Sequence, residues 1–323
     1  MILNTLNSLK IVFAGTDKFS KDHLKILVTN TTHKILGVIT KPDQPLGRGK
    51  QITSSLTKKL AKKLKIPVFQ PTALNTSTFY NQIYNLNADI IIVVSYGKII
   101  PQLILNIFPL GGINVHTSLL PRWRGPSPIQ SALLNGDKLT GITIIKMNNN
   151  IDTGDIIYSS SCIINKSDTS VTLQNKLKIL SCQGLIQVLK NFKSSYFPIR
   201  QSNLATYSNK INKEDAKLIW LKSAIQLERS IRAYNPWPIC YFKINNQLSI
   251  KVWSANVIIH FNQHKYQIGE IILINKHGMQ IKTSKNILNI TTVQLPGKKI
   301  MHANNLCNSK NKWCIPGTKL TNT

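Results

Sequence analysis

Two polar residues lie two positions apart in a short apolar stretch of the chain. Residues 112–116 read Gly-Ile-Asn-Val-His, so Asn114 and His116 alternate with aliphatic residues as on a β-strand. Side chains two apart on a strand face the same way, and open α/β sheets bind ligands where their strands end. An amide and an imidazole placed there can converge on one oxygen that gains negative charge. We therefore take Asn114 and His116 as a candidate catalytic pair.

A carboxylate follows the next apolar stretch, residues 141–147. Residues 148–155 read Asn-Asn-Asn-Ile-Asp-Thr-Gly-Asp, a loop in which Asp152 could orient an imidazole or share its proton. We interpret Asp155 as a turn residue. The alternative for His116 is a buried histidine with a purely structural role, because many histidines are partly buried without doing chemistry.

The chain has no Gly-x-Ser-x-Gly nucleophile motif beside these residues. Its absence argues against a covalent acyl-enzyme. It favours direct attack by a nucleophile of the substrate, assisted by an oxyanion donor and a His/Asp pair that moves a proton.

A cationic loop is predicted over residues 40–51, after an apolar stretch at 35–40. Two prolines and two glycines separate Lys41, Arg48 and Lys50, which could grip phosphate groups. The loop matches neither a Walker A motif nor a dinucleotide-binding motif, so a solvated turn is the alternative interpretation.

The elements that must position these residues alternate between strands and helices. Strands are predicted at 9–14, 35–40, 89–95, 112–116 and 141–147, and helical periodicity occurs around Leu56 to Leu64, Phe79 to Leu86, 129–134 and 171–189. This order predicts an α/β fold with a doubly wound, mostly parallel, Rossmann-like sheet over residues 1–194.

A polar, unpatterned segment at 195–213 reads as a linker to a second domain at 214–323. There the pattern predicts one helix at 224–233 and short strands near 240–244, 248–253, 267–273, 278–283 and 288–293. Many short strands favour a smaller, OB-like β-barrel, a type that often binds nucleic acid.

Charge and composition narrow the class of protein. The 323 residues carry 41 basic and 12 acidic side chains, a net charge of +29 that would attract a polyanion such as RNA. Thirty-five of the 41 are Lys, so biased composition is an equally good explanation of the charge. The five cysteines form no C-x-x-C pair, which argues against a zinc site. The longest aliphatic run, Ile90 to Val94, is far too short to span a membrane, so we expect a chain that is soluble and not exported.

A set of motifs lies in order across both predicted domains: Phe13-Ala14-Gly15-Thr16, the loop from Pro42 to Lys50, Ser95-Tyr96-Gly97, residues 113–116 with 118–125, residues 151–155, Leu227 to Pro238, and Pro316-Gly317. In these motifs the whole chain resembles methionyl-tRNA formyltransferases, within the folate-dependent formyltransferases. The resemblance implies formyl transfer from 10-formyltetrahydrofolate to the methionine α-amino group of initiator tRNA.

It further implies that Asn114, His116 and Asp152 are catalytic and that Ser118, Leu119, Leu120 and Pro121 line the folate site. The loop with Lys41, Arg48 and Lys50 would bind the acceptor stem, and the C-terminal domain would bind tRNA. No metal is implied, and we expect a monomer in the bacterial cytoplasm, with an organellar matrix as the less favoured setting.

Three positions depart from the family pattern: Asp17 in place of Pro, Thr117 in place of a small residue and Gln44 in place of Arg. An alternative function is formylation of a small amine, such as a nucleotide sugar or glycinamide ribonucleotide. The basic C-terminal region argues against it, because a small amine creates no need for such a domain. An RNA-binding protein without catalysis would leave the combination of Asn114, His116 and Asp152 unexplained.

Overall fold

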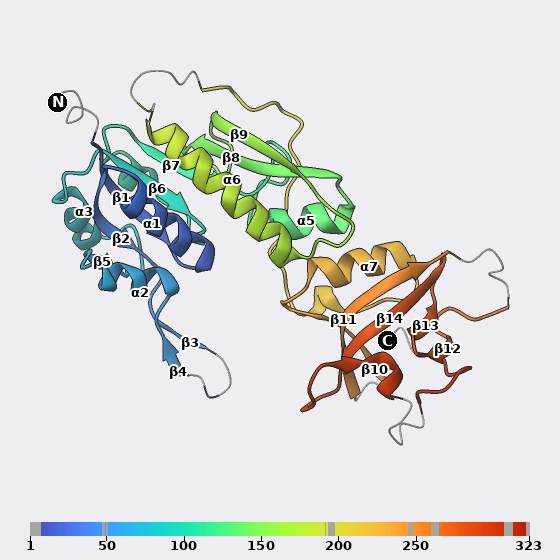
Figure 1. Ribbon diagram of the computed structural model, residues 1–323. Coiled ribbons are helices and arrows are strands. Elements are labelled where there is room, and N and C mark those ends of the chain that lie inside the picture. Colours follow the sequence, from blue (N-terminus) through green and yellow to red (C-terminus); the bar gives the residue numbers. More distant parts are fainter. Residues whose placement is uncertain are drawn as a thin grey trace. The chain divides into compact units, whose positions relative to one another are not determined.

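The computed structural model describes residues 8–46, 49, 51–190, 192, 198–244, 248–259, 265–306 and 313–320 (Figure 1). The chain forms two compact units. The first comprises Met1–Pro128, Leu139–Ile163 and Asn175–Asn209, and the second comprises Ile129–Lys138, Ile164–Gln174 and Lys210–Thr323. Arg48 and Lys50 lie outside the described residues.

The first unit is built on a seven-stranded sheet with the strand order β5-β2-β1-β6-β7-β8-β9. The five strands from β5 to β7 run parallel, and β8 and β9 join antiparallel at one edge. This confirms the mostly parallel sheet. The strands are β1 Lys10–Gly15, β2 Lys34–Ile39, β5 Val68–Phe69, β6 Ile90–Val94, β7 Gly112–His116, β8 Leu139–Lys146 and β9 Ile156–Ile163.

Helices bury both faces of this sheet. All five residues of β6 are buried, as expected for a central parallel strand covered on two sides. Ile91 and Val93 pack with Phe79, Ile83 and Ile104, which come from α3 and α4. The helices of the chain up to residue 190 are α1 Lys18–Asn30, α2 Leu56–Lys63, α3 Ser77–Tyr84, α4 Gln102–Leu105, α5 Pro128–Asn135 and α6 Ser170–Lys190. Nearly all of α5 and the first turn of α6 belong to the second unit.

Asp17, one of the three departures from the family pattern, is the N-cap of α1. Its Oδ1 accepts a hydrogen bond from the Ser20 backbone N–H at 2.9 Å, which satisfies one of the free donors of the first turn. Its Oδ2 accepts from the Ser95 hydroxyl at 2.7 Å. Proline could make neither bond, so Asp17 links the start of α1 to the loop after β6.

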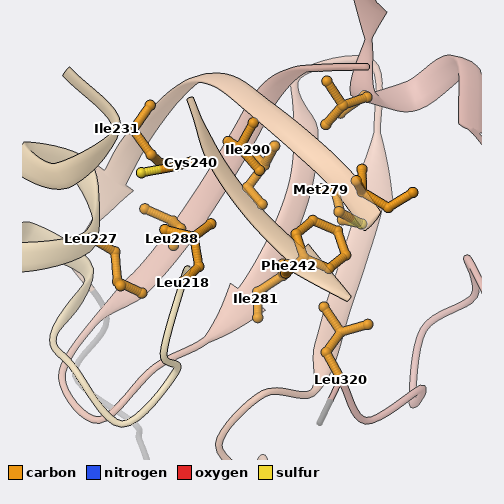
Figure 2. Close-up of a cluster of buried hydrophobic side chains, with 14 of the residues drawn as sticks. Leu218, Leu227, Ile231, Cys240, Phe242, Met279, Ile281, Leu288, Ile290 and Leu320 are labelled. Carbon is orange, nitrogen blue, oxygen red and sulfur yellow. The ribbon is translucent and has the colours of Figure 1, made fainter. Parts of the chain in front are cut away.

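The second unit has an antiparallel sheet with the order β10-β11-β14-β13-β12, and β15 pairs with β14. Its core gathers Leu218, Leu227, Phe242, Met279 and Leu288 (Figure 2). This confirms a second, smaller β domain. Its elements are α7 Ala224–Ala233, β10 Cys240–Ile244, β11 Leu248–Ile258, β12 Ile271–Asn275, β13 Gly278–Lys282, β14 Ile287–Gln294 and β15 Met301–His302, with 3₁₀ turns at Glu214–Ala216 and Ala303–Leu306.

The predicted elements differ from the observed ones in a few places. β12 begins at Ile271, four residues later than predicted, because Gly269 takes a positive φ of 87° and forms a turn. β11 continues five residues beyond the predicted end. The predicted loop at 40–51 contains the short strand β3 Gln44–Leu46 and leads into β4 Gln51–Thr53, which pair with each other. The edge strand β9 and the helix α1 were not predicted.

A histidine is fully buried where α1 meets α6. His23 Nδ1 lies 2.8 Å from the Phe19 carbonyl, which can only accept, so Nδ1 carries the hydrogen. His23 Nε2 lies 2.8 Å from the Ser181 hydroxyl. Both ring nitrogens are therefore partnered when the ring is neutral. Burial lowers the pKa of His23 from 6.5 to about 4.

This lowered pKa predicts that the protein loses stability in mild acid. Between about pH 6.5 and 4 the unfolded chain protonates His23 and the folded chain does not, so the free energy of unfolding falls as pH falls through this window. Below the folded pKa the loss is complete, at roughly 2–4 kcal/mol. Urea unfolding of the wild type and of His23→Gln at several pH values checks this, with His277→Gln, at an exposed histidine, as the control. Equal pH dependence in wild type and His23→Gln would contradict it.

Candidate active site

The Asp152 carboxylate brings three parts of the chain together. Its Oδ1 accepts a hydrogen bond from Asn114 Nδ2 at 3.1 Å, and its Oδ2 lies 3.4 Å from His116 Nδ1. Oδ2 also accepts from the Gly125 backbone N–H at 2.8 Å. Asn114 and His116 come from the end of β7, as their spacing predicted. Asp152 arrives from the loop between β8 and β9.

His116 has an oxygen acceptor at each ring nitrogen. Nε2 lies 2.9 Å from the Trp123 carbonyl oxygen, opposite the contact of Nδ1 with Asp152. The side chain is only 7% exposed. The two contacts fix the orientation of the imidazole ring between Asp152 and the Trp123 carbonyl.

The backbone of Asp152 is fixed in an unusual conformation. Its φ is +54°, in the left-handed region that non-glycine residues seldom adopt. Gln201 Nε2 donates to the carbonyl oxygens of Asp152 and Gly154, at 2.8 and 2.7 Å. Gln201 is buried and belongs to the segment that the sequence analysis interpreted as a linker, where no periodicity or motif marks it. Gln201 thus holds the backbone of Asp152, and its hydrogen bonds do not involve the carboxylate.

The loop after β7 contains the four residues assigned to folate binding. Thr143 Oγ1, from β8, donates to the Ser118 carbonyl at 2.7 Å and accepts from the Leu120 N–H at 3.0 Å. The Ser118 hydroxyl donates to the Arg122 carbonyl at 2.6 Å. Ser118 and Leu120 are buried, while Leu119 and Pro121 are partly exposed. The loop, which follows His116 in the chain, is thus held by one internal hydrogen bond and by two to Thr143 of β8.

The base of the cationic loop is held by an ion pair. Asp43 Oδ2 lies 2.6 Å from Lys58 Nζ, and Gln70 Nε2 donates to Asp43 Oδ1 at 2.8 Å. These hydrogen bonds, from Lys58 above all, lower the pKa of Asp43 to about 2. Lys41 is partly exposed, and its ammonium lies close to Gly97, where a Cβ would meet it. Of Lys41, Arg48 and Lys50, the three basic residues predicted to bind phosphate, only Lys41 lies among the described residues.

The described residues contain no group of three His, Cys, Asp or Glu side chains that could hold a metal ion. Within the same ranges, no helix has the length and apolar character needed to cross a membrane.

The sequence matches two family models that together span both units. The Formyl transferase model matches residues 9–189, and the model for the Formyl transferase C-terminal domain matches residues 210–311. Methionyl-tRNA formyltransferase of Buchnera aphidicola subsp. Acyrthosiphon pisum (strain Tuc7) is 50% identical over 98% of this chain and 100% of its own length. The chain belongs to the methionyl-tRNA formyltransferase family.

Other comparisons fit this family. The methionyl-tRNA formyltransferase of Buchnera aphidicola subsp. Schizaphis graminum (strain Sg) is 49% identical over 95% of this chain and 98% of its own. The N-formyltransferase of Helicobacter canadensis, crystallised with folinic acid and dTDP-3-aminofucose, superposes with a TM-score of 0.63 at 21% identity, over 87% of this chain and 99% of that one. HypX of Aquifex aeolicus, in complex with tetrahydrofolic acid, gives 0.59 at 14% identity, over 92% of this chain and 46% of that one. At such identities the solved structures show a shared fold.

In this member of the methionyl-tRNA formyltransferase family, Gly154 is needed for the course of the Asp152 loop. A Cβ at position 154 would clash with the Lys146 carbonyl oxygen, a backbone atom that cannot move alone. Lys146 N–H also donates to the Asp155 carbonyl at 2.9 Å, which ties the loop to β8. We expect Gly154→Ala to lower the free energy of unfolding by about 1–3 kcal/mol, the usual cost of overpacking.

Asn150→Ala is the matched control, because Asn150 is exposed in the same loop and its hydrogen bonds there use backbone atoms. Urea unfolding of both variants checks the prediction. Equal stability of Gly154→Ala and Asn150→Ala would contradict the need for glycine at 154.

Proposed function

We propose that the chain transfers the formyl group of 10-formyltetrahydrofolate to the methionine α-amino group of initiator tRNA, with Asn114, His116 and Asp152 as catalytic residues. Formyl transfer to methionyl-tRNA is the activity named for its relatives at about 50% identity. The observation that carries the assignment of residues is the convergence of Asn114 and His116 on the Asp152 carboxylate at the end of β7.

The chemistry is a direct acyl transfer. The amine attacks the formyl carbon, a new C–N bond forms, and the bond from that carbon to the folate nitrogen breaks. Asn114 uses one amide N–H to bind Asp152, which leaves its second N–H to donate to the formyl oxygen as negative charge grows on it.

The attacking amine also loses a proton. We assign this proton to His116 together with Asp152, because the imidazole ring is held in place by the Asp152 carboxylate and the Trp123 carbonyl. The leaving folate nitrogen takes up a proton when its bond to the formyl carbon breaks. No covalent enzyme intermediate is needed.

The folate donor is proposed to lie along Ser118, Leu119, Leu120 and Pro121. Two observations support this site. The loop follows β7 directly, at the carboxyl edge where open α/β sheets bind ligands. Two proteins of the same fold were crystallised with tetrahydrofolic acid or folinic acid.

The tRNA is proposed to contact Lys41, Arg48 and Lys50 with its acceptor stem and the C-terminal domain with its backbone. From Asp215 onward the chain carries 15 basic and three acidic residues, which supports a role in holding RNA. We assign residues 1–194 to catalysis, 195–213 to the linker and 214–323 to the tRNA-binding domain, and propose a monomer that works in the bacterial cytoplasm.

The proposed function is tested by offering the protein different amines as acceptors of the formyl group. The purified full-length protein is incubated with 10-formyltetrahydrofolate and either methionyl initiator tRNA, an amino sugar nucleotide or glycinamide ribonucleotide, and formylated products are measured. We expect formylated methionyl-tRNA only. Formylation of a small amine in preference to the tRNA would overturn the proposal.

Truncation of the catalytic side chains is expected to reduce turnover more than binding. Asn114→Ala should lower kcat by about 10²–10³, the loss typical of one oxyanion donor. His116→Ala and Asp152→Ala should each lower it by at least about 10², because acid–base assistance is lost. Single-turnover rates with saturating donor and tRNA check this, and Asn150→Ala, an exposed asparagine of the Asp152 loop, should keep the wild-type rate. A wild-type rate in any of the first three variants would remove that residue from the catalytic set.

A further inference from the structure

A polar cavity of about 430 Å³ opens beside the proposed catalytic residues. Its walls include Arg124, Thr153, Asp155, Arg200, Gln201 and Tyr207, all within the first unit. Thr153 and Asp155 follow Asp152 in the chain, and Arg124 precedes Gly125, whose N–H binds the Asp152 carboxylate. The cavity therefore adjoins the Asn114, His116 and Asp152 cluster without containing those residues.

Arg124 is fixed at the wall of this cavity. Its Nη2 and Nε donate to Gln201 Oε1 at 2.8 and 3.1 Å, and its Nη1 donates to the Tyr207 hydroxyl at 3.3 Å. These bonds use three of the five guanidinium N–H groups and leave two for a ligand. Both partners, Gln201 and Tyr207, are neutral, so the charge of Arg124 is oriented but not neutralised.

Arg200 adds a second positive charge to the same wall. It is exposed, and within the described ranges it makes no hydrogen bond or ion pair. No described carboxylate forms an ion pair with Arg124 either. Two arginines with unused donors suit a phosphate, which they can bind through several charge-assisted hydrogen bonds.

One carboxylate, that of Asp155, lines the cavity together with amide and hydroxyl side chains. It would repel a second carboxylate, such as the glutamate of a folate, but it can accept a hydrogen bond from a ribose hydroxyl. Carboxylates bind the ribose 2′-OH in this way in other α/β folds. Phosphate donors and a ribose acceptor in one cavity favour a nucleotide.

We propose that this cavity binds the last nucleotide of the aminoacylated 3′ end, with its phosphate on Arg124 and Arg200 and its ribose 2′-OH on Asp155. The inference rests on the proposed function. Methionine is esterified to this nucleotide, so seating the ribose beside Asp155 brings the amino group to the loop that also carries Asp152, three positions earlier in the sequence. The cavity would thus set the position of the reactive amine independently of contacts to the rest of the tRNA.

The first test neutralises Arg200. Arg200→Gln should raise the KM for methionyl-tRNA about tenfold, the effect of one charge-assisted hydrogen bond, and leave kcat and the KM for the folate donor within about twofold. Lys25→Gln is the matched control, because Lys25 is exposed on α1 of the same unit and its loss removes the same charge. Equal values for the two variants, or a rise in the donor KM of Arg200→Gln instead, would overturn the assignment.

The second test addresses the ribose. With tRNA ending in 2′-deoxyadenosine and charged on the 3′-OH, the wild type should show a KM raised about five- to tenfold. Asp155→Ala, which has no side-chain acceptor for the 2′-OH, should show a similar rise with ordinary tRNA and should no longer distinguish the two tRNAs. Full discrimination by Asp155→Ala would contradict the role of Asp155.

Binding of methionyl-tRNA without turnover, measured for the same variants, separates this inference from the proposed function. Arg200-dependent binding without formylation by the wild type would refute the function and leave the cavity assignment standing. If the wild type formylates methionyl-tRNA but its binding does not depend on Arg200, the proposed function stands and the cavity assignment is refuted.

Discussion

The Asp152 carboxylate is the interaction on which the rest of the site depends. It accepts from Asn114 and from the Gly125 N–H, and it faces His116, so one side chain joins the end of β7, the loop after β7 and the loop after β8. The carboxylate reaches them only because Asp152 holds a left-handed backbone conformation. That conformation is supported by Gln201 and by the lack of a side chain at Gly154. Any element that moved relative to β7 would break several of these contacts at once.

The sheet explains why the contacts can be held. β7 lies between β6, whose residues are all buried, and β8, which runs antiparallel to it. Because β8 runs antiparallel to β7, the end of β8 lies opposite the start of β7. The loop after β8 must therefore run along the sheet to reach His116. Gln201 binds this loop through the Gly154 carbonyl, and the lack of a side chain at Gly154 lets the loop pass. Thr143, in the middle of β8, lies opposite His116 and holds the 118–121 loop.

Several strands of the sheet and the Asn114 and His116 pair could be predicted from the sequence, because each is marked by a pattern of neighbouring residues. The alternation of polar and apolar residues placed Asn114 and His116 on one side of a strand, and the long hydrophobic runs located β1, β2 and β6. Gln201 could not be found in this way, because its role depends on contacts with residues 47 and 49 positions earlier in the chain and nothing periodic surrounds it. The strand β9 was missed for a related reason. Three consecutive serines interrupt its apolar residues, so no regular pattern marks it, and its place at the sheet edge is fixed by pairing with β8.

Lysines and arginines make different contributions to the electrostatics of this protein. Of 41 basic residues only six are arginines, and four of these, Arg124, Arg200, Arg229 and Arg232, take structural or cavity positions. Arg232 binds Glu228 through two nitrogens and donates to the Asp168 carbonyl, while Arg229 donates to the Asn135 carbonyl. Such multiple bonds need the planar guanidinium, which a lysine cannot replace. The lysines supply most of the charge without such geometry. Long-range attraction of a polyanion therefore depends on their number, whereas the register of a bound ligand depends on the few arginines whose positions the fold defines.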